Sequence, residues 1–555
     1  MYSPLSPPAL KQSDSKVNWG NLQRTTETLA IAKFTENSDG SSLIITSDVN
    51  GANRLHRELR FFMGPEQTPI LHFPDWETLA FDHFSPHEDI ISNRLATLHK
   101  ASHLKNGIII AALPTLLQRT LPRHHLAAHA FILQKGDKIR IDKLNVQLVQ
   151  AGYHHVDAVR EHGEFAVRGS IWDVFPTGSD SPFRIELFDD DIETIRSFDP
   201  ETQLSKQQFD HIELLPAREY PLTDDAITHF RQQFRSQFSG NPRDCAIYEA
   251  ISNGKPFPGT EYYLPLFYEQ LDTFFDYLPE HCTVFIPNDI QEKFIKNWGD
   301  IEKRYEQLRY DRTRPLCTPS QLYLNQAQFF AKLKSHMQVR VSDELLDDKF
   351  GNYNFSRASL PNIQIESKEK QPLNKLKAFL DNVNYPILFT AESSGRRETL
   401  LDLLREIHIT PHAIDSWTDF IATNSAQATH AICVAPLDHG LVLDDPELAL
   451  IPEASLFGEQ VMQRRLRNKQ QTDVANLIHS LAELKIDAPV VHIQYGIARY
   501  KGLEVIETGD VKAEYLTLEY ADKDKVYVPI NSLHMISRYT GVDADHAKPN
   551  KLGSN

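Results

Sequence analysis

The strongest constraint on the fold is a change of pattern near residue 489, after which the chain consists of short strand-like segments. Residues 513–520 (AEYLTLEY) include an alternation of apolar and polar side chains, and β-branched and aromatic residues recur in 490–507 and 525–530. The charged segment 521–524 (ADKD) has the composition of a turn. This pattern predicts antiparallel strands. A module of roughly fifty residues buries little apolar surface, so we expect a docking platform rather than a reaction vessel.

Length and charge bound the class of protein. A chain of 555 residues is too long for one hydrophobic core and predicts several domains of ~100–200 residues each. The formal net charge is −17, which argues against a broad nucleic-acid-binding surface, because phosphate binding needs clustered lysines and arginines. The four cysteines have no paired spacing and the 24 histidines form no metal signature, so we expect neither disulfides nor a metal site. We find no transmembrane run and no signal peptide, and expect a cytoplasmic protein without a membrane partner.

The first part of the chain has the pattern of an α/β domain. Short apolar strands are predicted at 43–46 and 107–112, and an amphipathic helix is predicted at 51–62. The alternation of buried strands with helices predicts a parallel sheet.

Two segments bear on nucleotide binding. A nucleotide-binding α/β domain carries a glycine-rich loop that ends in Gly-Lys-Ser/Thr before its first helix. The corresponding segment here, 19–26 (WGNLQRTT), has one glycine and no lysine, and 393–397 (SSGRR) lacks a second glycine and a lysine. We therefore expect a degenerate nucleotide site at 19–26 and a plain helix N-terminus at 393–397. We predict no catalytic residue and no bound cofactor in this chain.

A second group of strands points to a docking face. Three strands are predicted, at 164–168, 171–175 and 183–188. Period-two alternation turns Ile185 and Leu187 inward and leaves Arg184 and Phe188 outward, on an otherwise polar face with Arg168. Arginines beside an aromatic ring are typical of a protein–protein hot spot. In the alternative, Phe188 folds over the core and the arginines are solvated; spacing alone does not separate the two.

Two further segments have less specific patterns. The aromatic-rich segment 253–279 suits either base stacking or a packed core, and the net charge with interleaved leucines and prolines favours the core. Residues 289–312 predict a charged helix with a solvated face.

Several segments resemble the bacterial transcription-repair coupling factor family. Residues 489–502 (PVVHIQYGIARYKG) and 514–539 (EYLTLEYADKDKVYVPINSLHMISRY) are similar to its RNA-polymerase-interacting domain. Residues 162–176 (HGEFAVRGSIWDVFP) and 181–203 (SPFRIELFDDDIETIRSFDPETQ) are similar to the UvrA-binding domain that the family shares with the excision-repair protein UvrB. Residues 73–100 resemble the UvrB-related module of the family.

The resemblance implies a multidomain α/β and α+β chain. It predicts a degenerate RecA-like or UvrB-like module with an inserted α+β domain, then a small α/β domain and a small β-barrel of the SH3 or Tudor type. The expected boundaries are a flexible leader at 1–16, the first part of the UvrB-like domain at 17–125, the inserted UvrA-binding domain at 126–215, the second part of the UvrB-like domain at 216–345, a linker at 346–372, the small α/β domain at 373–460, a helical connector at 461–486, the RNA-polymerase-interacting barrel at 487–545 and the start of a linker at 546–555.

The resemblance also implies site residues for two partners. The family positions that contact UvrA fall on Arg168, Arg184 and Phe188, which favours the docking interpretation of that face. The family partner of the C-terminal module is the β-subunit of RNA polymerase. We predict that it binds by strand addition at an exposed edge, at Leu503, Glu504, Val505 and Ile506. Pro529 cannot donate to a ladder and is predicted at an edge or a strand end.

The family's motor, a double-stranded DNA translocase that uses ATP and magnesium, is expected outside this chain, because no complete phosphate loop or acidic helicase box occurs here. The segment between Trp76 and Asp89 has no room for UvrB's long DNA-gripping hairpin, so we do not expect damage recognition. We predict a monomeric recruitment scaffold for transcription-coupled repair that is not itself an ATPase and touches DNA through the missing motor. The alternative is a stand-alone transcription regulator that uses only the C-terminal barrel.

Overall fold

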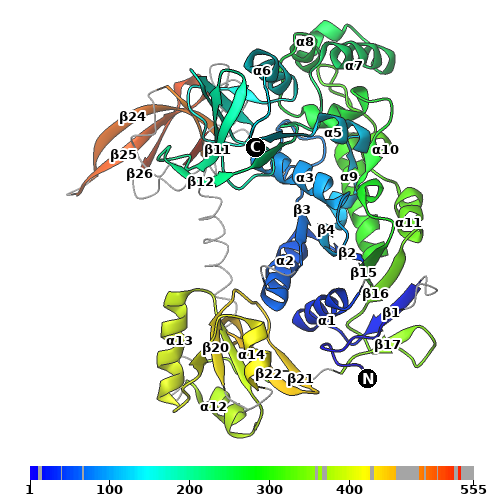
Figure 1. Ribbon diagram of the computed structural model, residues 1–555, viewed down its shortest axis with the longest axis vertical. Helices are drawn as coiled ribbons and strands as arrows, with labels where there is room; N and C mark the ends of the chain where they lie inside the picture. Colours follow the sequence, from blue (N-terminus) through cyan, green and yellow to red (C-terminus); the bar gives the residue numbers. More distant parts are fainter. Residues whose placement is uncertain are drawn as a thin grey trace. The chain divides into compact units, whose positions relative to one another are not determined.

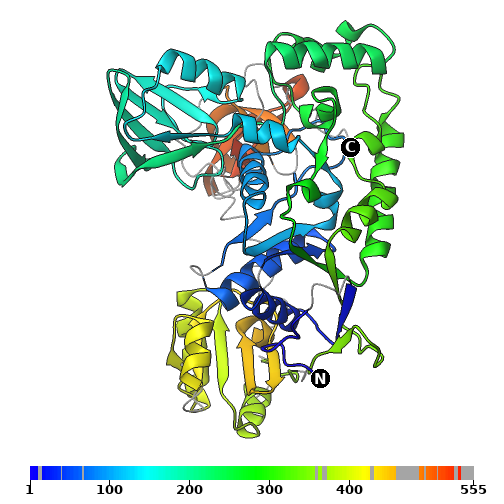
Figure 2. The same cartoon turned by 45° about the vertical axis from the view of Figure 1, so that its right-hand side comes forward.

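The structure is a computed structural model of mixed α/β architecture (Figures 1 and 2). It describes residues 1–10, 16–38, 40–64, 68–356, 360–365, 372–424, 430–457, 487–492, 496–508, 511–529 and 536–538. The chain divides into two compact units, Met1–Lys255 with Gly259–Gly458, and Pro256–Pro258 with Glu459–Asn555. Among the described residues, every helix is too short or too polar to cross a membrane.

A parallel seven-stranded sheet organises the first domain of the larger unit, with strand order β17-β1-β16-β15-β2-β4-β3. Its strands are β1 (Lys16–Gly20), β2 (Ser41–Thr46), β3 (Ile70–Phe73), β4 (Gly107–Ala112), β15 (Cys282–Pro287), β16 (Met337–Val341) and β17 (Asn352–Asn354). The central strands β2 and β4 are buried along their whole length, as parallel strands covered on both faces must be. The strands predicted at 43–46 and 107–112 are confirmed.

Helices cover this sheet. The amphipathic helix predicted at 51–62 is α2 (Val49–Met63), whose Asp48 side chain caps the backbone N–H of Gly51. Leu55, Leu59 and Phe62 are buried on its inner face. The other α-helices of this domain are α1 (Thr25–Glu36), α3 (Glu88–Ala101), α4 (Leu113–Leu117), α5 (Arg123–His129), α7 (Asp224–Gln237), α8 (Ala246–Ser252), α9 (Ile290–Leu308), α10 (Pro319–Leu322) and α11 (Gln326–Lys334). A two-stranded sheet joins β5 (Arg119–Thr120) to β14 (Asp272–Thr273).

The aromatic side chains of the second half of this domain form a core. Tyr262, Tyr263, Phe274 and Tyr277 are almost completely buried, so the interpretation of 253–279 as packed core is confirmed. Between β3 and α3, residues 74–87 contain no strand.

The beginning of the chain is not a free leader over the described residues 1–10. The backbone N–H of Tyr2 donates to the Asn354 carbonyl at 2.8 Å, and the Ser356 N–H donates to the Tyr2 carbonyl at 2.8 Å. The leader prediction for 1–16 is therefore wrong for these residues. A polar, proline-rich composition does not reveal that the segment finds backbone partners more than 300 positions away.

The linker prediction for 346–372 is wrong at its start. Residues 352–354 form the edge strand β17 beside β1. Phe355 is completely buried and packs on Trp19 with ring centroids 5.1 Å apart. A single buried ring inside a polar segment produces no periodic signal, so the pattern did not reveal it.

The inserted α+β domain has a six-stranded sheet of order β12-β11-β10-β9-β8-β7. The strands are β7 (His154–His155), β8 (Glu164–Arg168), β9 (Ile171–Val174), β10 (Phe183–Phe188), β11 (Asp191–Phe198) and β12 (Ser205–Phe209), and a separate pair joins β6 (Phe131–Gln134) to β13 (His211–Leu214). Leu144 and Leu148 of α6 (Ile141–Gln150) pack with Trp172 and Ile185 on the inner face of the sheet. The three predicted strands of this domain are confirmed.

A third domain occupies residues 372–457. Its sheet has the order β19-β20-β18-β22-β21. The elements are α12 (Asn374–Asp381), β18 (Ile387–Ala391), α13 (Ser394–Glu406), β19 (His412–Ala413), α14 (Trp417–Asn424), β20 (Ala431–Val434), β21 (Leu441–Asp444), β22 (Glu447–Pro452) and α15 (Glu453–Phe457). The small domain predicted at 373–460 thus contains both helices and a β-sheet, as an α/β domain should.

The smaller unit contains an antiparallel five-stranded sheet of order β26-β25-β24-β23-β27. The strands are β23 (Pro489–His492), β24 (Gly496–Thr508), β25 (Val511–Glu519), β26 (Lys525–Pro529) and β27 (Ile536–Arg538). Leu516, Leu518 and Tyr520 alternate into its small core with Val490 and Val528. The predicted connector 461–486 and the segment 546–555 lie outside the described residues.

Candidate functional site

The strand register of the inserted domain brings charged residues together on one face. Arg184 of β10 lies directly opposite Asp173 of β9, and Asp173 lies opposite Ala166 of β8. Residues directly opposite in a ladder share a face of the sheet, and Arg168 follows Ala166 on the same face two positions later. The predicted outward placement of Arg168 and Arg184 is therefore what the register produces.

Asp173 is the centre of this face. Its carboxylate is completely buried and accepts Arg184 Nε on Oδ1 at 2.8 Å and Arg184 Nη2 on Oδ2 at 3.0 Å. Arg168 Nη2 donates to Oδ2 at 2.5 Å. The hydrogen bonds to Asp173 hold the pKa of Arg184 above its usual value. One buried carboxylate thus fixes two guanidinium groups, and the cluster keeps one net positive charge.

The two arginines differ in what they can offer a partner. Arg184 is only 17% exposed; its Nη1 donates to the Gln203 carbonyl at 3.1 Å, and its guanidinium carbon lies 4.8 Å from the centroid of the Phe198 ring. Arg168 is 49% exposed. We infer that Arg184 has a structural role, because its guanidinium is bonded within the domain, whereas the guanidinium of Arg168 is accessible to a partner.

Phe188 is 70% exposed at the end of β10. The alternative in which this ring folds over the core is therefore wrong. The solvated-arginine half of that alternative is also wrong for Arg184, which is bonded within the domain.

The face is less polar than predicted. Val159, Ala166, Phe175 and Phe198 form a small apolar cluster under the Arg184 side chain. The prediction of an otherwise polar face missed it, because Val159 lies outside the predicted strands and comes from a neighbouring loop. Sequence reasoning also missed Asp173, Gln203 and Phe198. Only Asp173 had a usable signal, since it stands between the inward Trp172 and Val174 and must point to the arginine face.

Beside this cluster lies a second pair of charges. Glu186 accepts a hydrogen bond from Thr194 Oγ1 at 2.8 Å, and Arg196 Nη1 lies 3.7 Å from its carboxylate. Both side chains are partly exposed, and ion pairs near the surface contribute little to stability.

The predicted polymerase-binding residues lie on β24. Leu503, Glu504, Val505 and Ile506 pair with β25 in antiparallel register. The pairing of β24 with β23 covers only 496–499, so among the described strands the other backbone edge of 503–506 has no partner. The Glu504 side chain is exposed, 3.5 Å from Lys525 Nζ. The side chains of Leu503, Val505 and Ile506 lie outside the described residues.

Two further features shape this sheet. A β-bulge interrupts the β24–β25 register between Tyr500 and Gly502, and bulges increase the local twist of a strand. Pro529 is the last residue of β26, which pairs only with β25 among the described strands. The prediction that Pro529 stands at an edge or a strand end is confirmed.

The single glycine of the segment 19–26, Gly20, is the last residue of β1 and has a structural explanation. A Cβ at Gly20 would meet Asn354 Oδ1 at 2.5 Å and the Glu344 carbonyl at 2.9 Å. Gly20 therefore allows β1 to pack against its neighbours, and no phosphate is needed to explain it.

Carboxylates and arginines both surround the loop between β1 and α1, the arginines being Arg24, Arg54 and Arg57. Burial raises the pKa of Glu27 to about 7; Arg54 opposes this shift, while Glu58, Asp289 and Asp343 increase it. The lysine of a phosphate loop is missing from the segment 19–26.

At 393–397, Ser393 caps α13 by accepting the Arg396 N–H. The buried Glu453 carboxylate accepts the Glu392 N–H at 3.2 Å and also pairs with Arg396. This helix N-terminus already has a carboxylate of the chain beside it. The part of the chain that the structure describes contains no group of three or more His, Cys, Asp or Glu arranged to hold a metal.

Three parts of the chain match family models. They are the UvrB interaction domain over residues 131–220, the MFD D3 domain over 379–456, and the CarD-like/TRCF RID domain over 484–540.

Curated relatives match almost the whole chain. The transcription-repair-coupling factor of Haemophilus influenzae is 40% identical over 96% of this chain and 46% of its own length. That of Escherichia coli K12 is 38% identical over 94% of this chain and 45% of its own length, and that of Staphylococcus aureus MRSA252 is 26% identical over 96% and 46%. The chain spans about half the length of these relatives. Over the part that it spans, the chain therefore belongs to the family of transcription-repair-coupling factors.

Proposed function

We propose that this chain is a recruitment scaffold for transcription-coupled DNA repair, which binds RNA polymerase through its C-terminal sheet and UvrA through its inserted domain. The observation that carries the proposal is that one chain contains both a UvrB interaction domain and a CarD-like/TRCF RID domain. A regulator that used only the C-terminal module would not need the inserted domain, so the scaffold is favoured over that alternative.

The UvrA contact is proposed for the face around Asp173. Phe188 offers an exposed ring and Arg168 a half-exposed guanidinium. Phenylalanine and arginine are both enriched in protein–protein interfaces, and arginine is also enriched among hot spots. Because Asp173 fixes Arg168, less side-chain entropy is lost when a partner binds it. Arg184 contributes as a support of this arrangement.

The polymerase contact is proposed for the unpaired edge of β24 at 503–506. An exposed edge offers backbone donors and acceptors to a strand of the partner, here the β-subunit of RNA polymerase. The proposal includes closure of the five-stranded sheet into a small SH3- or Tudor-like barrel.

The energy-consuming step is proposed to lie outside this chain. The segment 19–26 lacks the lysine of a phosphate loop. In this proposal the chain is a monomeric cytoplasmic scaffold without ATPase activity, and ATP, magnesium and double-stranded DNA are bound by the translocase motor of the whole protein.

Binding of purified UvrA to Phe188→Ala tests the inserted domain. Truncation of a hot-spot aromatic costs about 2 kcal/mol or more, so we expect the Kd to rise roughly 30-fold. Val146→Ala is the matched control, because Val146 is an exposed apolar residue of α6, the helix that covers the opposite face of the sheet. Equal UvrA affinity of the two variants would remove this assignment.

Binding of RNA polymerase to Ile506→Arg tests the edge. A charge on the strand that pairs with the partner must be desolvated, so we expect loss of detectable binding. Tyr527→Ala on β26 is the control for a substitution elsewhere in the same sheet. Unchanged affinity of Ile506→Arg would exclude strand addition at 503–506.

A further inference from the structure

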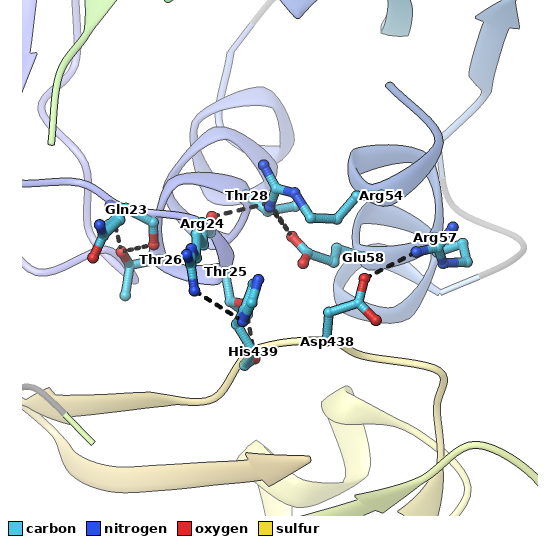
Figure 3. A network of polar contacts seen from close by, with 10 residues as sticks. All are labelled: Gln23, Arg24, Thr25, Thr26, Thr28, Arg54, Arg57, Glu58, Asp438 and His439. Atoms are coloured by element: carbon cyan, nitrogen blue, oxygen red, sulfur yellow. Dashed lines mark hydrogen bonds and ion pairs between the residues drawn. The ribbon is translucent and has the colours of Figure 1, made fainter. Parts of the chain in front are cut away.

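The N-terminus of α1 lies beside the third domain. In α/β folds that bind phosphate, the first helix after the first strand points its N-terminal N–H groups at the ligand. Here α1 begins at Thr25, directly after the loop that follows β1. Figure 3 shows that the segment approaching this end of α1 is a loop of the third domain with Asp438 and His439.

The loop makes direct polar contacts with α1 and its preceding residue. Thr25 Oγ1 donates to the backbone carbonyl of His439 at 2.8 Å, and Arg24 Nη1 lies 3.1 Å from His439 Nδ1 (Figure 3). A guanidinium can only donate, so His439 Nδ1 is the acceptor and the ring is neutral. Consistently, burial together with the charges of Arg24 and Arg54 lowers the pKa of His439 to about 4.

A second contact reaches α2. Arg57 Nη2 donates to Asp438 Oδ2 at 3.1 Å, with the Asp438 side chain only 12% exposed. The loop is thus held from both helices that cover this side of the parallel sheet.

An apolar contact underlies the polar one. Trp417 of α14 is buried and packs edge-to-face on Phe62 of α2, with ring centroids 5.1 Å apart. One hydrophobic cluster runs without interruption from Trp19 and Leu59 of the first domain to Leu437 of the third. At the same side, Ser3 Oγ donates to the Asp445 carbonyl at 2.7 Å, so the beginning of the chain also reaches the third domain.

We infer that the loop 435–440 is an intramolecular plug, which takes the place of a phosphate at the N-terminus of α1 and fastens the third domain to the first. The position that a ligand would occupy at the N-terminus of α1 is thus used for the contact between the first and the third domain. It assigns the third domain a task of its own: it closes the degenerate site and makes the UvrB-like module and the third domain move as one body. A nucleotide phosphate and the plug exclude each other.

Hydrogen–deuterium exchange of the segment 21–28 tests the plug in the whole chain. In Asp438→Lys, the new ammonium faces Arg57, and we expect exchange in 21–28 to become roughly tenfold faster, equivalent to about 1.4 kcal/mol of lost docking. The single variant Arg57→Glu should do the same by placing two carboxylates together. The double variant Arg57→Glu/Asp438→Lys restores opposite charges and should return exchange to within about threefold of the parent.

Two controls make the outcome decisive. Asp402→Lys introduces the same charge change at an exposed position of α13 in the third domain, and the exchange rate of 21–28 should stay at the parental value in this variant. The exchange rate of 164–168 in the inserted domain should stay at the parental value in every variant. The inference is overturned if Asp438→Lys and Arg57→Glu leave exchange in 21–28 at the parental rate, or if the charge swap fails to restore it. Protection of 21–28 in the parent chain by added ATP and magnesium would overturn it as well, since a plugged site admits no phosphate.

Discussion

Replacement of Asp173 by asparagine removes one negative charge from the centre of the proposed UvrA-binding face and keeps the volume of the side chain. The carboxylate is completely buried and accepts three hydrogen bonds from Arg168 and Arg184. In Asp173→Asn the side-chain nitrogen faces guanidinium donors, and the two cations lose their counter-charge. We therefore expect the inserted domain to lose stability.

The magnitude follows from the exposure of the partners. Removal of one member of a buried ion pair costs about 3–5 kcal/mol. Arg168 is 49% exposed and regains water, whereas Arg184 is 17% exposed and does not, so we take the lower end, about 3 kcal/mol. If β8–β10 exchange by opening of the inserted domain, their amide exchange should become roughly 100-fold faster.

The assay is hydrogen–deuterium exchange of 164–188, with 387–391 in β18 as the internal reference. Glu186→Gln is the matched control, because Glu186 loses the same charge on the same face but is 36% exposed; its effect should stay below about 1 kcal/mol. The reasoning is refuted if Asp173→Asn exchanges within about fivefold of the parent, or no faster than Glu186→Gln.

Three further predictions concern other parts of the larger unit. In Gly20→Ala the new Cβ has no room beside Asn354 and the Glu344 carbonyl. We expect the free energy of unfolding, measured with urea, to fall by about 1–3 kcal/mol. An unchanged midpoint of unfolding would contradict this and would show that β17 can move away from Gly20. Arg94 is completely buried, donates to Glu219 and to the Pro74 carbonyl at 2.8 Å each, and stacks on Phe73. A lysine cannot make both hydrogen bonds in this geometry, so we expect Arg94→Lys to lower the free energy of unfolding by about 2–4 kcal/mol in the same assay. Arg405→Lys, at an exposed position of α13, is the control and should have little effect. His162 lies 2.7 Å from Asp89 and 2.8 Å from the Ser179 carbonyl through its two ring nitrogens; burial lowers its pKa, but these bonds outweigh burial and raise it above 6.5. The contribution of the protonated His162 ring to stability is thus complete below pH 6.5 and is lost as the pH rises through the folded pKa. The difference in the free energy of unfolding between parent and His162→Gln should therefore be larger at pH 5.5 than at pH 8.5. A difference independent of pH would contradict a charged ring.

Local pattern was sufficient where the signal is local. The helix α2 and the strands β8 to β10 follow from periodicities of 3.6 and 2 within single segments. Counting along β10 places Phe188 on the outward face, but it does not decide whether the ring folds over the core; the 70% exposure of the ring decides that. The missing lysine in 19–26 is likewise a local fact. These predictions needed no knowledge of which strand lies beside which.

The rest depends on pairings between distant segments. The edge strand β17, the backbone bonds of Tyr2 and the burial of Phe355 require residues more than 300 positions apart to meet. Asp173 acquires its importance only through the register of β8, β9 and β10, which hydrophobic alternation does not specify. The contact of His439 with Thr25 likewise joins two domains, and no pattern in the sequence of either domain predicts it.

Two helix N-termini show how an α/β framework of this kind can exist without a ligand. Each leaves backbone N–H groups that need an acceptor or solvent, and each carries the positive end of a helix dipole. At α13 the buried Glu453 carboxylate lies beside the helix start and accepts the Glu392 N–H. At α1 the carbonyl and imidazole of His439 accept from the side chains of Thr25 and Arg24. At α13 a carboxylate of the chain thus stands beside the positive end of the helix dipole, whereas at α1 neutral groups of His439 occupy the neighbouring space. Neither helix start therefore depends on a bound nucleotide for a polar neighbour.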